Sequence, residues 1–486
     1  MVISLLFEEL TPTRVLTQNS TKQSYHLYKT ATDGKAETEV IMGLEAVGDL
    51  ALNEILSKLG PKETAKVACV NKRFKASATE DSLWSKFCSQ DLHLSAPLDP
   101  HGNLVPSFKF AYGLWREVFT MYPWPLVKRV KRCWDRLKNW LTANFPEAGA
   151  TLQQGASETQ IRELEVVLKV KLPLPTRVLY RFCNGQVFQD KDAPKGALGN
   201  TLGLIGGYTF YHHLVNVYLL PLDEVILETN QVMRQLEISG SFRRKFIVVA
   251  RSSTFQEKLF FLDCTSGQLY VGTRNLATDL EMLPCVPSGL LNSVHDFNSD
   301  QLQDAMLLWL EEHGRCLQDG IIKLREERKV RAICQFPEEP PLCSTAITNG
   351  VKVRASAVFV PEAADLPDST EKYWFAYSIR MSLLPEGCIV NGMHFSSCQL
   401  QKRHWIIRAN GNVVSDVNAE GVIGKYPLLL PGEREFVYQS CTPLSTSSGS
   451  VEGHFTFVPD RLVDSKGAPF EVEVARFPLQ LPDYIF

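Results

Sequence analysis

Long apolar runs are missing from this sequence. No segment approaches the roughly 18–20 consecutive apolar residues that a membrane-spanning helix needs. The most apolar candidate, residues 214–222, is interrupted by Asn216 and Pro221. The N-terminus reads MVISLLFEEL, with no early positive charge and with two glutamates that cut the apolar stretch short. Neither a secretory signal nor an organellar transit peptide is therefore expected.

Cysteine is also sparse. Twelve cysteines are spread over 486 residues without a CxxC pair or a regular spacing. Secreted domains that depend on disulfides have denser and more patterned cysteines, so we expect free thiols in a reducing compartment. Together with the missing targeting segment, this predicts a nuclear or cytoplasmic protein.

An excess of either charge is the third absence. The 51 Lys and Arg residues nearly balance the 54 Asp and Glu residues, so we expect neither nucleic acid nor an anionic membrane as a partner of the whole chain. A composition of 44% hydrophobic and 22% charged residues is typical of soluble globular proteins. The length predicts about three domains.

Residues 47–87 carry the pattern on which the rest of the interpretation depends. Apolar residues recur there at helical spacings in two bursts, Ile55, Leu56 and Leu59 and then Val67, Val70 and Phe74. Gly60-Pro61 is expected to end one helix and begin the next, because proline is favoured in the first helical turn and disfavoured inside a helix. Forty residues of short amphipathic helices bury too little apolar surface to be stable alone. The segment is therefore expected to bind a partner.

The order of Leu50, Ile55-Leu56, Leu59, Pro61, Val67, the VNKRF motif ending at Phe74, and Leu83-Trp84 resembles an F-box, which we place at residues 42–90. An F-box docks on a Skp-type adaptor, which connects it to the cullin and RING subunits of a ubiquitin ligase. The resemblance implies a set of residues that face the adaptor or support that face: Leu50, Ile55, Leu56, Leu59, Pro61, Val67, Val70, Phe74 and Trp84. The alternative is a helical hairpin that belongs to the core of the next domain.

The segments on either side of the F-box differ in character. Residues 1–41 are polar, rich in Thr, Ser and Gln, and are expected to form a mostly disordered extension. Residues 91–149 are expected to form a helical, basic linker. Its stretch 126–140 has an apolar stripe made of Leu126, Val130, Trp134 and Leu137, continued by Leu141. Such a helix can bind membranes, nucleic acid or calmodulin-like partners, but we favour a helix packed on the next domain with solvated charges.

Residues 150–314 combine helices with strands. Ser157 and Gln160 form a capping box that opens a helix, Leu172-Pro173 breaks it, and Asn184-Gly185 closes a second helix. Strands are expected at 246–250, 259–263 and 268–271, and a last helix at 299–313. The arrangement resembles the SUKH (Smi/Knr-like) domain, carried by Ile161, Leu164-Glu165, Leu172-Pro173, Phe182, Asn184-Gly185, the FFLD strand and Trp309. Members of that family mostly bind other proteins.

Residues 315–344 are charged and then proline-rich, which is typical of an extended linker. From residue 345 the pattern is that of strands, including YWFAYSIRM at 373–381 and a hairpin around Asn410-Gly411-Asn412. Seven or eight strands without a helical pattern predict a β-sandwich over 345–486. The motifs YWFAYSIRM, LQKRHWIIRANGNV, EGVIGKYPLLLPGEREFVYQS and GSVEGHFTFV resemble ApaG, whose domains are similar to fibronectin type III sandwiches.

Candidate chemistry is weak throughout the chain. ApaG has been linked to a GxGxxG phosphate fingerprint, but the first glycine is replaced here by Ala419, and only Gly421 and Gly424 remain. A dinucleotide loop also requires a preceding strand and a following helix, so these glycines are better explained as turn residues. No metal-ligand spacing occurs. We expect no cofactor, no metal and no catalytic residue.

The sequence thus predicts a multidomain α+β protein with a small helical F-box, an α+β SUKH-like domain and a C-terminal all-β sandwich. A combination of F-box, SUKH and ApaG domains is similar to the Skp-interacting-partner F-box proteins of plants. That resemblance implies a non-catalytic substrate receptor of a Skp–cullin–F-box ubiquitin ligase, with an unknown protein substrate. Two alternatives stay open: an interaction scaffold without ubiquitin transfer, and a small-ligand sensor that uses the sandwich.

Overall fold

The computed structural model describes residues 47–187, 201–211, 213–237, 245–252, 258–279, 281–292, 295, 302–327 and 330–486. The predicted extension, residues 1–41, lies outside the described residues. Residues 47–55 belong to one compact unit and residues 56–486 to another, and each is described by itself. None of the described helices combines the length and apolar character that crossing a bilayer requires.

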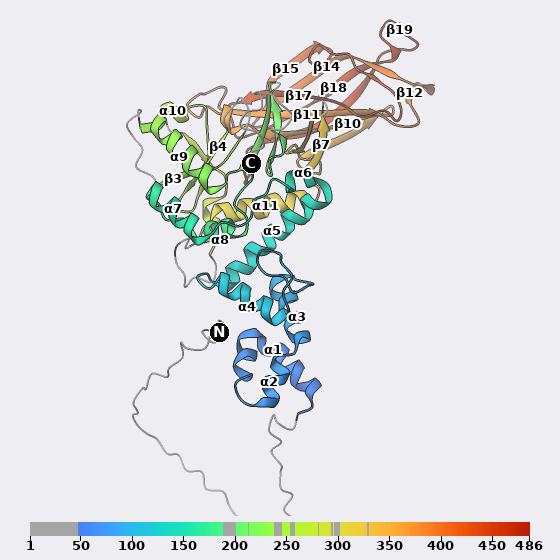
Figure 1. Ribbon diagram of the computed structural model, residues 1–486. Coiled ribbons are helices and arrows are strands. Elements are labelled where there is room, and N and C mark those ends of the chain that lie inside the picture. Colours follow the sequence, from blue (N-terminus) through green and yellow to red (C-terminus); the bar gives the residue numbers. More distant parts are fainter. Residues whose placement is uncertain are drawn as a thin grey trace, which may run out of the picture. The chain divides into compact units, whose positions relative to one another are not determined.

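The N-terminal part of the described chain is helical (Figure 1). Its elements are α1 (Asp49–Val67), α2 (Lys72–Ala78), α3 (Asp81–Leu92), α4 (Phe108–Val118), α5 (Trp124–Asn144) and α6 (Pro146–Gly149). Gly60 interrupts α1 with a φ of 80° and a ψ of 171°, which are not helical values. The break confirms that Gly60-Pro61 ends one helix and begins the next, because glycine tolerates a positive φ that other residues disfavour.

The middle domain, residues 158–334, packs helices against one mixed sheet. Its helices are α7 (Glu158–Leu168), α8 (Leu174–Phe182), α9 (Leu222–Glu237), α10 (Leu276–Asp279), η4 (Ser288–Leu290) and α11 (Ala305–Gln318). The capping box of Ser157 and Gln160 at the start of α7 is confirmed. Helix α11 begins later than the predicted residue 299, because Asp304 is its N-cap and accepts a hydrogen bond from the Leu307 amide at 2.9 Å.

Eight strands form the middle sheet in the order β6-β5-β4-β3-β2-β1-β8-β7. They are β1 (Gly206–Phe210), β2 (His213–Leu219), β3 (Phe246–Ser252), β4 (Leu259–Asp263), β5 (Leu269–Gly272), β6 (Met282–Pro284), β7 (Lys323–Glu327) and β8 (Val330–Cys334). The three strands predicted from their apolar runs are β3, β4 and β5, and β4 is buried along its whole length. Strand β1 pairs in parallel with β8, whereas the other pairs among the described strands of this sheet are antiparallel.

The prediction of a linker at residues 315–344 is wrong. This stretch contains the end of α11 and both strands β7 and β8, which pair with each other and extend the middle sheet. The high charge of the EERKVR sequence suggested a solvated linker. The structure places Glu326 beside Arg434 and Glu327 beside Arg380 of the C-terminal part, and sequence composition does not reveal such distant pairing.

A β-sandwich occupies residues 343–480, as predicted. One sheet has the order β17-β11-β10-β9, and the other joins β15, β14, β18 and β20, with β16 beside β14 and β19 beside β18 (Figure 1). The strands are β9 (Cys343–Thr348), β10 (Val351–Phe359), β11 (Tyr373–Leu383), β12 (Cys388–Val390), β13 (Met393–Phe395), β14 (Cys398–Ala409), β15 (Asn412–Glu420), β16 (Leu428–Leu429), β17 (Phe436–Leu444), β18 (Ser448–Arg461), β19 (Asp464–Ser465) and β20 (Phe470–Gln480). A short helix, η5 (Pro361–Ala363), links β10 and β11.

Two-residue Asn-Gly turns fix the register of three hairpins in the sandwich. Asn410 and Gly411 both have positive φ, and Ala409 pairs with Asn412, so the predicted hairpin between β14 and β15 is confirmed. Asn349-Gly350 and Asn391-Gly392 have the same backbone signs and connect β9 to β10 and β12 to β13. In the same sheet as the β14–β15 hairpin, the neighbouring strands β14 and β18 bring Trp405 and Phe455 together edge-on at 5.3 Å.

Candidate functional site

The predicted adaptor-binding residues fall into three groups by exposure. Four are exposed apolar side chains: Leu50 (89%), Val70 (65%), Leu59 (47%) and Ile55 (38%). Pro61 and Val67 are half-buried, whereas Leu56, Phe74 and Trp84 are buried. Leu50 and Ile55 belong to the first compact unit, and the other seven belong to the second. A buried side chain cannot reach a partner on the folded surface, so only the exposed group offers apolar contacts directly.

The buried residues hold the short helices α2 and α3 in place. Asn71 caps α2 by accepting a hydrogen bond from the Phe74 amide at 2.8 Å, which satisfies one of the free amides at the helix start. The indole of Trp84 donates to the carbonyl oxygen of Ala78 at 2.8 Å and meets the ring of Tyr112 edge-on at 5.5 Å. Phe74 and Trp84 therefore support the exposed residues rather than offering a contact surface.

Asp91 at the end of α3 ties the F-box segment to α4 and α5. Its carboxylate accepts hydrogen bonds from the Tyr112 hydroxyl (2.7 Å) and the Lys128 ammonium (2.9 Å). The Trp124 indole donates to the same carboxylate at 3.3 Å. Partial burial opposes ionisation, but these hydrogen bonds and the positive charge of Lys128 outweigh it and lower the pKa of Asp91. One carboxylate thus fixes three aromatic or basic side chains from two later helices.

Helix α5 packs on the middle domain, as the favoured prediction stated. Its apolar stripe is buried, and the indole of Trp134 donates to the carbonyl oxygen of Leu179 in α8 at 3.1 Å. The guanidinium of Arg129 donates two hydrogen bonds, of 2.8 and 2.6 Å, to the carboxylate of Glu311 in α11. The expected solvation of the basic charges is only partly correct, since Arg129 and Lys131 have acidic partners and Lys131 is buried.

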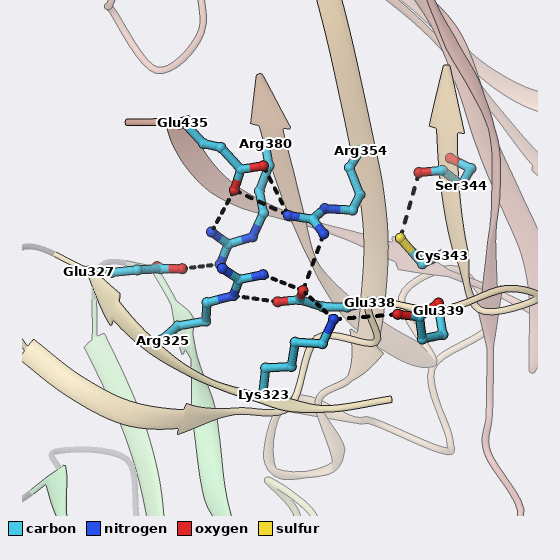
Figure 2. Close-up of polar contacts among 10 residues, drawn as sticks. All are labelled: Lys323, Arg325, Glu327, Glu338, Glu339, Cys343, Ser344, Arg354, Arg380 and Glu435. Atoms are coloured by element: carbon cyan, nitrogen blue, oxygen red, sulfur yellow. Dashed lines mark hydrogen bonds and ion pairs between the residues drawn. The ribbon is translucent and has the colours of Figure 1, made fainter. Parts of the chain in front are cut away.

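A cluster of charged side chains, here named the charged joint, connects the middle domain to the sandwich (Figure 2). Its members are Lys323, Arg325, Glu327, Glu338, Arg354, Arg380 and Glu435. Glu338, whose side chain is only 4% exposed, lies among Arg325, Lys323 at 3.6 Å and Arg354 at 3.2 Å. Burial favours the protonated carboxyl group, but the surrounding arginines outweigh it and lower the pKa of Glu338.

The second half of the charged joint belongs mainly to the sandwich. Arg354 of β10 donates to both carboxylate oxygens of Glu435 at 3.0 and 3.1 Å, while Arg380 of β11 pairs with Glu327 of β7. Figure 2 shows how Arg354 links the Glu338 and Glu435 ends of the cluster. Because Glu338 contacts cations from β7 and β10, and Glu327 of β7 contacts Arg380 of β11, the joint couples β7 to both β10 and β11.

A second interdomain contact is centred on Lys258, whose side chain is completely buried at the start of β4. Its ammonium donates to the Tyr208 hydroxyl at 3.0 Å and lies 3.8 Å from the Glu362 carboxylate of η5. The Tyr208 hydroxyl in turn donates to both Glu362 oxygens at 2.8 Å. Burial lowers the pKa of Lys258, whereas the nearby Glu362 opposes that effect. A carboxylate of the sandwich thus neutralises an ammonium of the middle domain.

The weak phosphate candidates Gly421 and Gly424 lie in a tight turn. Both have positive φ, and Val422 and Lys425 exchange two backbone hydrogen bonds of 2.9 Å across Ile423-Gly424. Residues 364–486, all of which the structure describes, contain no helix. The helix N-terminus that a dinucleotide loop requires is therefore missing from this region, and the arrangement is that of the predicted turn.

The sequence interpretation missed Glu338, Lys258 and Glu362. Their partners lie far away in the sequence, so no local spacing marks them. Lys258 offered one signal, because it directly precedes the fully buried strand LFFLD. A lysine beside such a strand is expected to require a buried counter-charge.

Comparison with known proteins agrees with the two ends of the chain. Residues 48–86 match the family described as the F-box domain, and residues 364–459 match the family described as the ApaG domain. The resemblance of residues 150–314 to a SUKH domain stays a prediction.

Similar proteins extend the match to most of the chain. The F-box protein SKIP16 of Arabidopsis thaliana is 61% identical over 446 residues, which cover 92% of this chain and 100% of that protein. F-box only protein 3 of Homo sapiens is 24% identical over 462 residues, covering 92% of this chain and 85% of that protein. Protein ApaG of Bradyrhizobium diazoefficiens is 35% identical over 138 residues, which are 28% of this chain and 93% of that protein.

Proposed function

We propose that this chain is the substrate receptor of a Skp–cullin–F-box ubiquitin ligase. The premise is its family: the chain belongs to the F-box proteins that carry a C-terminal ApaG domain. In this role the F-box segment binds a Skp-type adaptor, and through it the cullin and RING subunits. The middle domain and the sandwich hold the target protein. The receptor supplies no catalytic residue and works in the nucleus, the cytoplasm or both.

The observation that carries the proposal is the exposure of apolar side chains in the F-box segment. Leu50, Ile55, Leu59 and Val70 remain open to water although the neighbouring Leu56, Phe74 and Trp84 are buried. Burying one such aliphatic side chain contributes about 1.5–3 kcal/mol. Covering these side chains with an adaptor would therefore supply a substantial part of a stable association.

The mechanism is proximity. A target held by the receptor experiences a high effective concentration of the ubiquitin-charged conjugating enzyme, which converts an encounter of two molecules into a reaction within one assembly. Such positioning depends on a stiff connection between α3 and the target-binding domains. Asp91, Arg129 and the charged joint supply polar contacts along that connection within residues 56–486.

The test is adaptor pull-down with the double variant Ile55→Asp and Leu59→Asp in the full chain. Two carboxylates introduced at the exposed positions would have to be desolvated against an apolar partner, so we expect adaptor binding to fall by at least about 100-fold. Because neither side chain is buried in the free protein, the thermal unfolding temperature is expected to stay within the range of the wild type.

A matched control is Val463→Asp, which introduces the same charge at an apolar side chain that is 93% exposed on the sandwich. This variant is expected to retain full adaptor binding. Undiminished binding by the double variant would refute the adaptor role of these two side chains. Adaptor binding without co-purifying cullin would favour the scaffold alternative.

A further inference from the structure

The segment 481–486 leaves the sandwich after β20 and enters the middle domain. Leu481 still bonds to the sandwich, since its amide donates to the carbonyl oxygen of Ser447 at 2.8 Å. Four residues later, the amide of Ile485 donates to the carbonyl oxygen of Cys285 at 3.0 Å, directly after strand β6. Ile485 is 2% exposed, whereas Pro482 and Asp483 are exposed. The segment therefore crosses the surface and then inserts its last residues.

Trp309 of α11 provides the main contact surface for the inserted residues. Its indole donates to the carbonyl oxygen of Ile485 at 2.8 Å, and its ring stacks on Phe486 with a centroid distance of 5.7 Å and an interplanar angle of 20°. The ring of Trp309 also lies 4.9 Å from that of Phe260 in β4. The ring of His313, one helical turn further along α11, lies 5.5 Å from Phe486.

Lys258 also contacts the inserted residues. Its buried ammonium donates to the main-chain oxygen of Phe486, in addition to its contacts with Tyr208 and Glu362. Two consecutive main-chain oxygens, those of Ile485 and Phe486, are thus bound by side-chain donors of the middle domain. Donors that bind main-chain oxygens hold a peptide irrespective of its side chains, and the residues around those side chains select them.

We propose that Lys258, Cys285, Trp309 and His313, which contact residues 485–486, together with Phe260 beside Trp309, form a peptide-binding groove, and that residues 481–486 are its intramolecular ligand. The site takes a segment with an aliphatic residue followed by an aromatic one. Target proteins that carry such a segment would bind there by displacing the chain's own residues. The inference deepens the proposed function at its substrate end and rests on that function only for the ubiquitination of what binds.

The intramolecular ligand sets the concentration or affinity that a competing segment needs in order to displace it. A tethered segment has an effective concentration of about millimolar, so a free peptide of the same sequence hardly competes with it at lower concentrations. Removing residues 481–486 removes this competition and leaves the groove open. The same peptide is then expected to bind in trans.

The experiment uses the chain shortened to residues 1–480 and a fluorescein-labelled peptide of sequence LPDYIF. We expect saturable binding in fluorescence polarisation and a rise in the unfolding temperature on adding unlabelled peptide, because a ligand that binds only the folded state stabilises it. A peptide with aspartate in place of Ile485 is expected to bind about 10- to 100-fold more weakly, since a buried aliphatic contact is lost. A peptide with alanine in place of the exposed Asp483 is the matched control and should bind like the parent.

The result that overturns the proposal is a folded shortened chain that does not bind the peptide. If the shortened chain does not fold, millimolar peptide is expected to restore a cooperative unfolding transition, and failure to restore it overturns the proposal equally. The full-length variant Phe486→Ala provides a second measurement. It is expected to bind the labelled peptide at least tenfold more tightly than the wild type, because its own segment loses the ring that stacks on Trp309.

Adaptor pull-down with the same shortened chain separates this inference from the proposed function. No residue of the groove lies in the F-box segment, so adaptor binding is expected to persist. Lost peptide binding with intact adaptor binding refutes the groove alone. Intact peptide binding with no adaptor binding refutes the ligase role alone.

Discussion

The F-box segment and the charged joint differ in the side chains that they use: exposed apolar ones in the first, and buried charged ones in the second. The F-box segment exposes aliphatic side chains such as Leu59 and Val70. The charged joint buries a carboxylate, Glu338, among cations that come from β7 and β10. An exposed apolar surface gains free energy when a partner covers it, whereas a buried ion pair is sensitive to the removal of either partner. One region is therefore suited to association and the other to holding two domains in a fixed arrangement.

The contrast predicts that a change in the charged joint affects stability and leaves adaptor binding intact. Glu338→Ala leaves Arg325 and Arg354 without their shared carboxylate, and we expect a loss of about 3–5 kcal/mol in the free energy of unfolding. Urea denaturation followed by tryptophan fluorescence measures this loss. Adaptor pull-down on the same variant at a temperature where it is folded should match the wild type.

The neighbouring Glu339→Ala is the matched control for Glu338→Ala. Its side chain is 51% exposed and pairs only at 3.4 Å with the exposed ammonium of Lys323. Removal of such a surface pair is expected to cost less than about 1 kcal/mol. Equal effects of the two substitutions would contradict the importance of burial in the joint.

A pH titration of stability probes His313, a buried histidine of the middle domain. Burial lowers the pKa of His313 from 6.5 to about 4, so the folded state keeps this ring neutral where the unfolded state binds a proton. The neutral ring contributes its full share of stability above pH 6.5, and that share is lost as the pH falls towards 4. We expect the wild type to lose about 3 kcal/mol more than His313→Gln between pH 7 and pH 4.

Urea midpoints measured at half-unit pH intervals give that difference. Parallel profiles for His313→Gln and the wild type would show that the folded protein accepts a proton at His313 without cost.

The smallest expected effect concerns the F-box segment itself. Asn71→Ala removes the cap of α2 and should cost about 1 kcal/mol, because the Phe74 amide loses its acceptor. Asn71→Asp keeps an acceptor and should stay close to the wild type. Hydrogen exchange of the α2 amides measures both variants, and equal protection in all three proteins would rule out a stabilising cap.

The sequence predicted those parts of the fold that depend on short-range chemistry. Gly60-Pro61, the capping box of Ser157 and the Asn410-Gly411 turn each act through residues at most four positions apart, so their patterns are visible in the sequence. The Asn349-Gly350 turn has the same signature and could have been predicted by the same rule. The assignment of β7 and β8 to a linker failed although the two strands are neighbours and pair with each other, because their place in the middle sheet depends on the pairing of β8 with β1, far earlier in the sequence.

The candidate site was predictable in its residue types but not in its exposure. The spacing of Leu56 and Leu59 marks both as apolar helix positions, yet one is buried and the other is 47% exposed. Helical periodicity does not state which side of a short helix faces its own protein and which faces a partner. The groove around Trp309 was beyond prediction, because it forms only when Cys285, Lys258 and Ile485 meet in the folded chain.

The parallel pairing of β1 with β8 has a consequence for how the protein is made. Gly207 pairs with Cys334, so the middle sheet cannot be completed until the ribosome has released the chain beyond that residue. The strands from β1 to β6 then wait with an unpaired edge while the translation of α11, β7 and β8 proceeds. Long-range pairing of this kind is slow and leaves strand edges open to aggregation. Nascent chains of this protein are therefore expected to need chaperones most while residues between β6 and β8 are being synthesised.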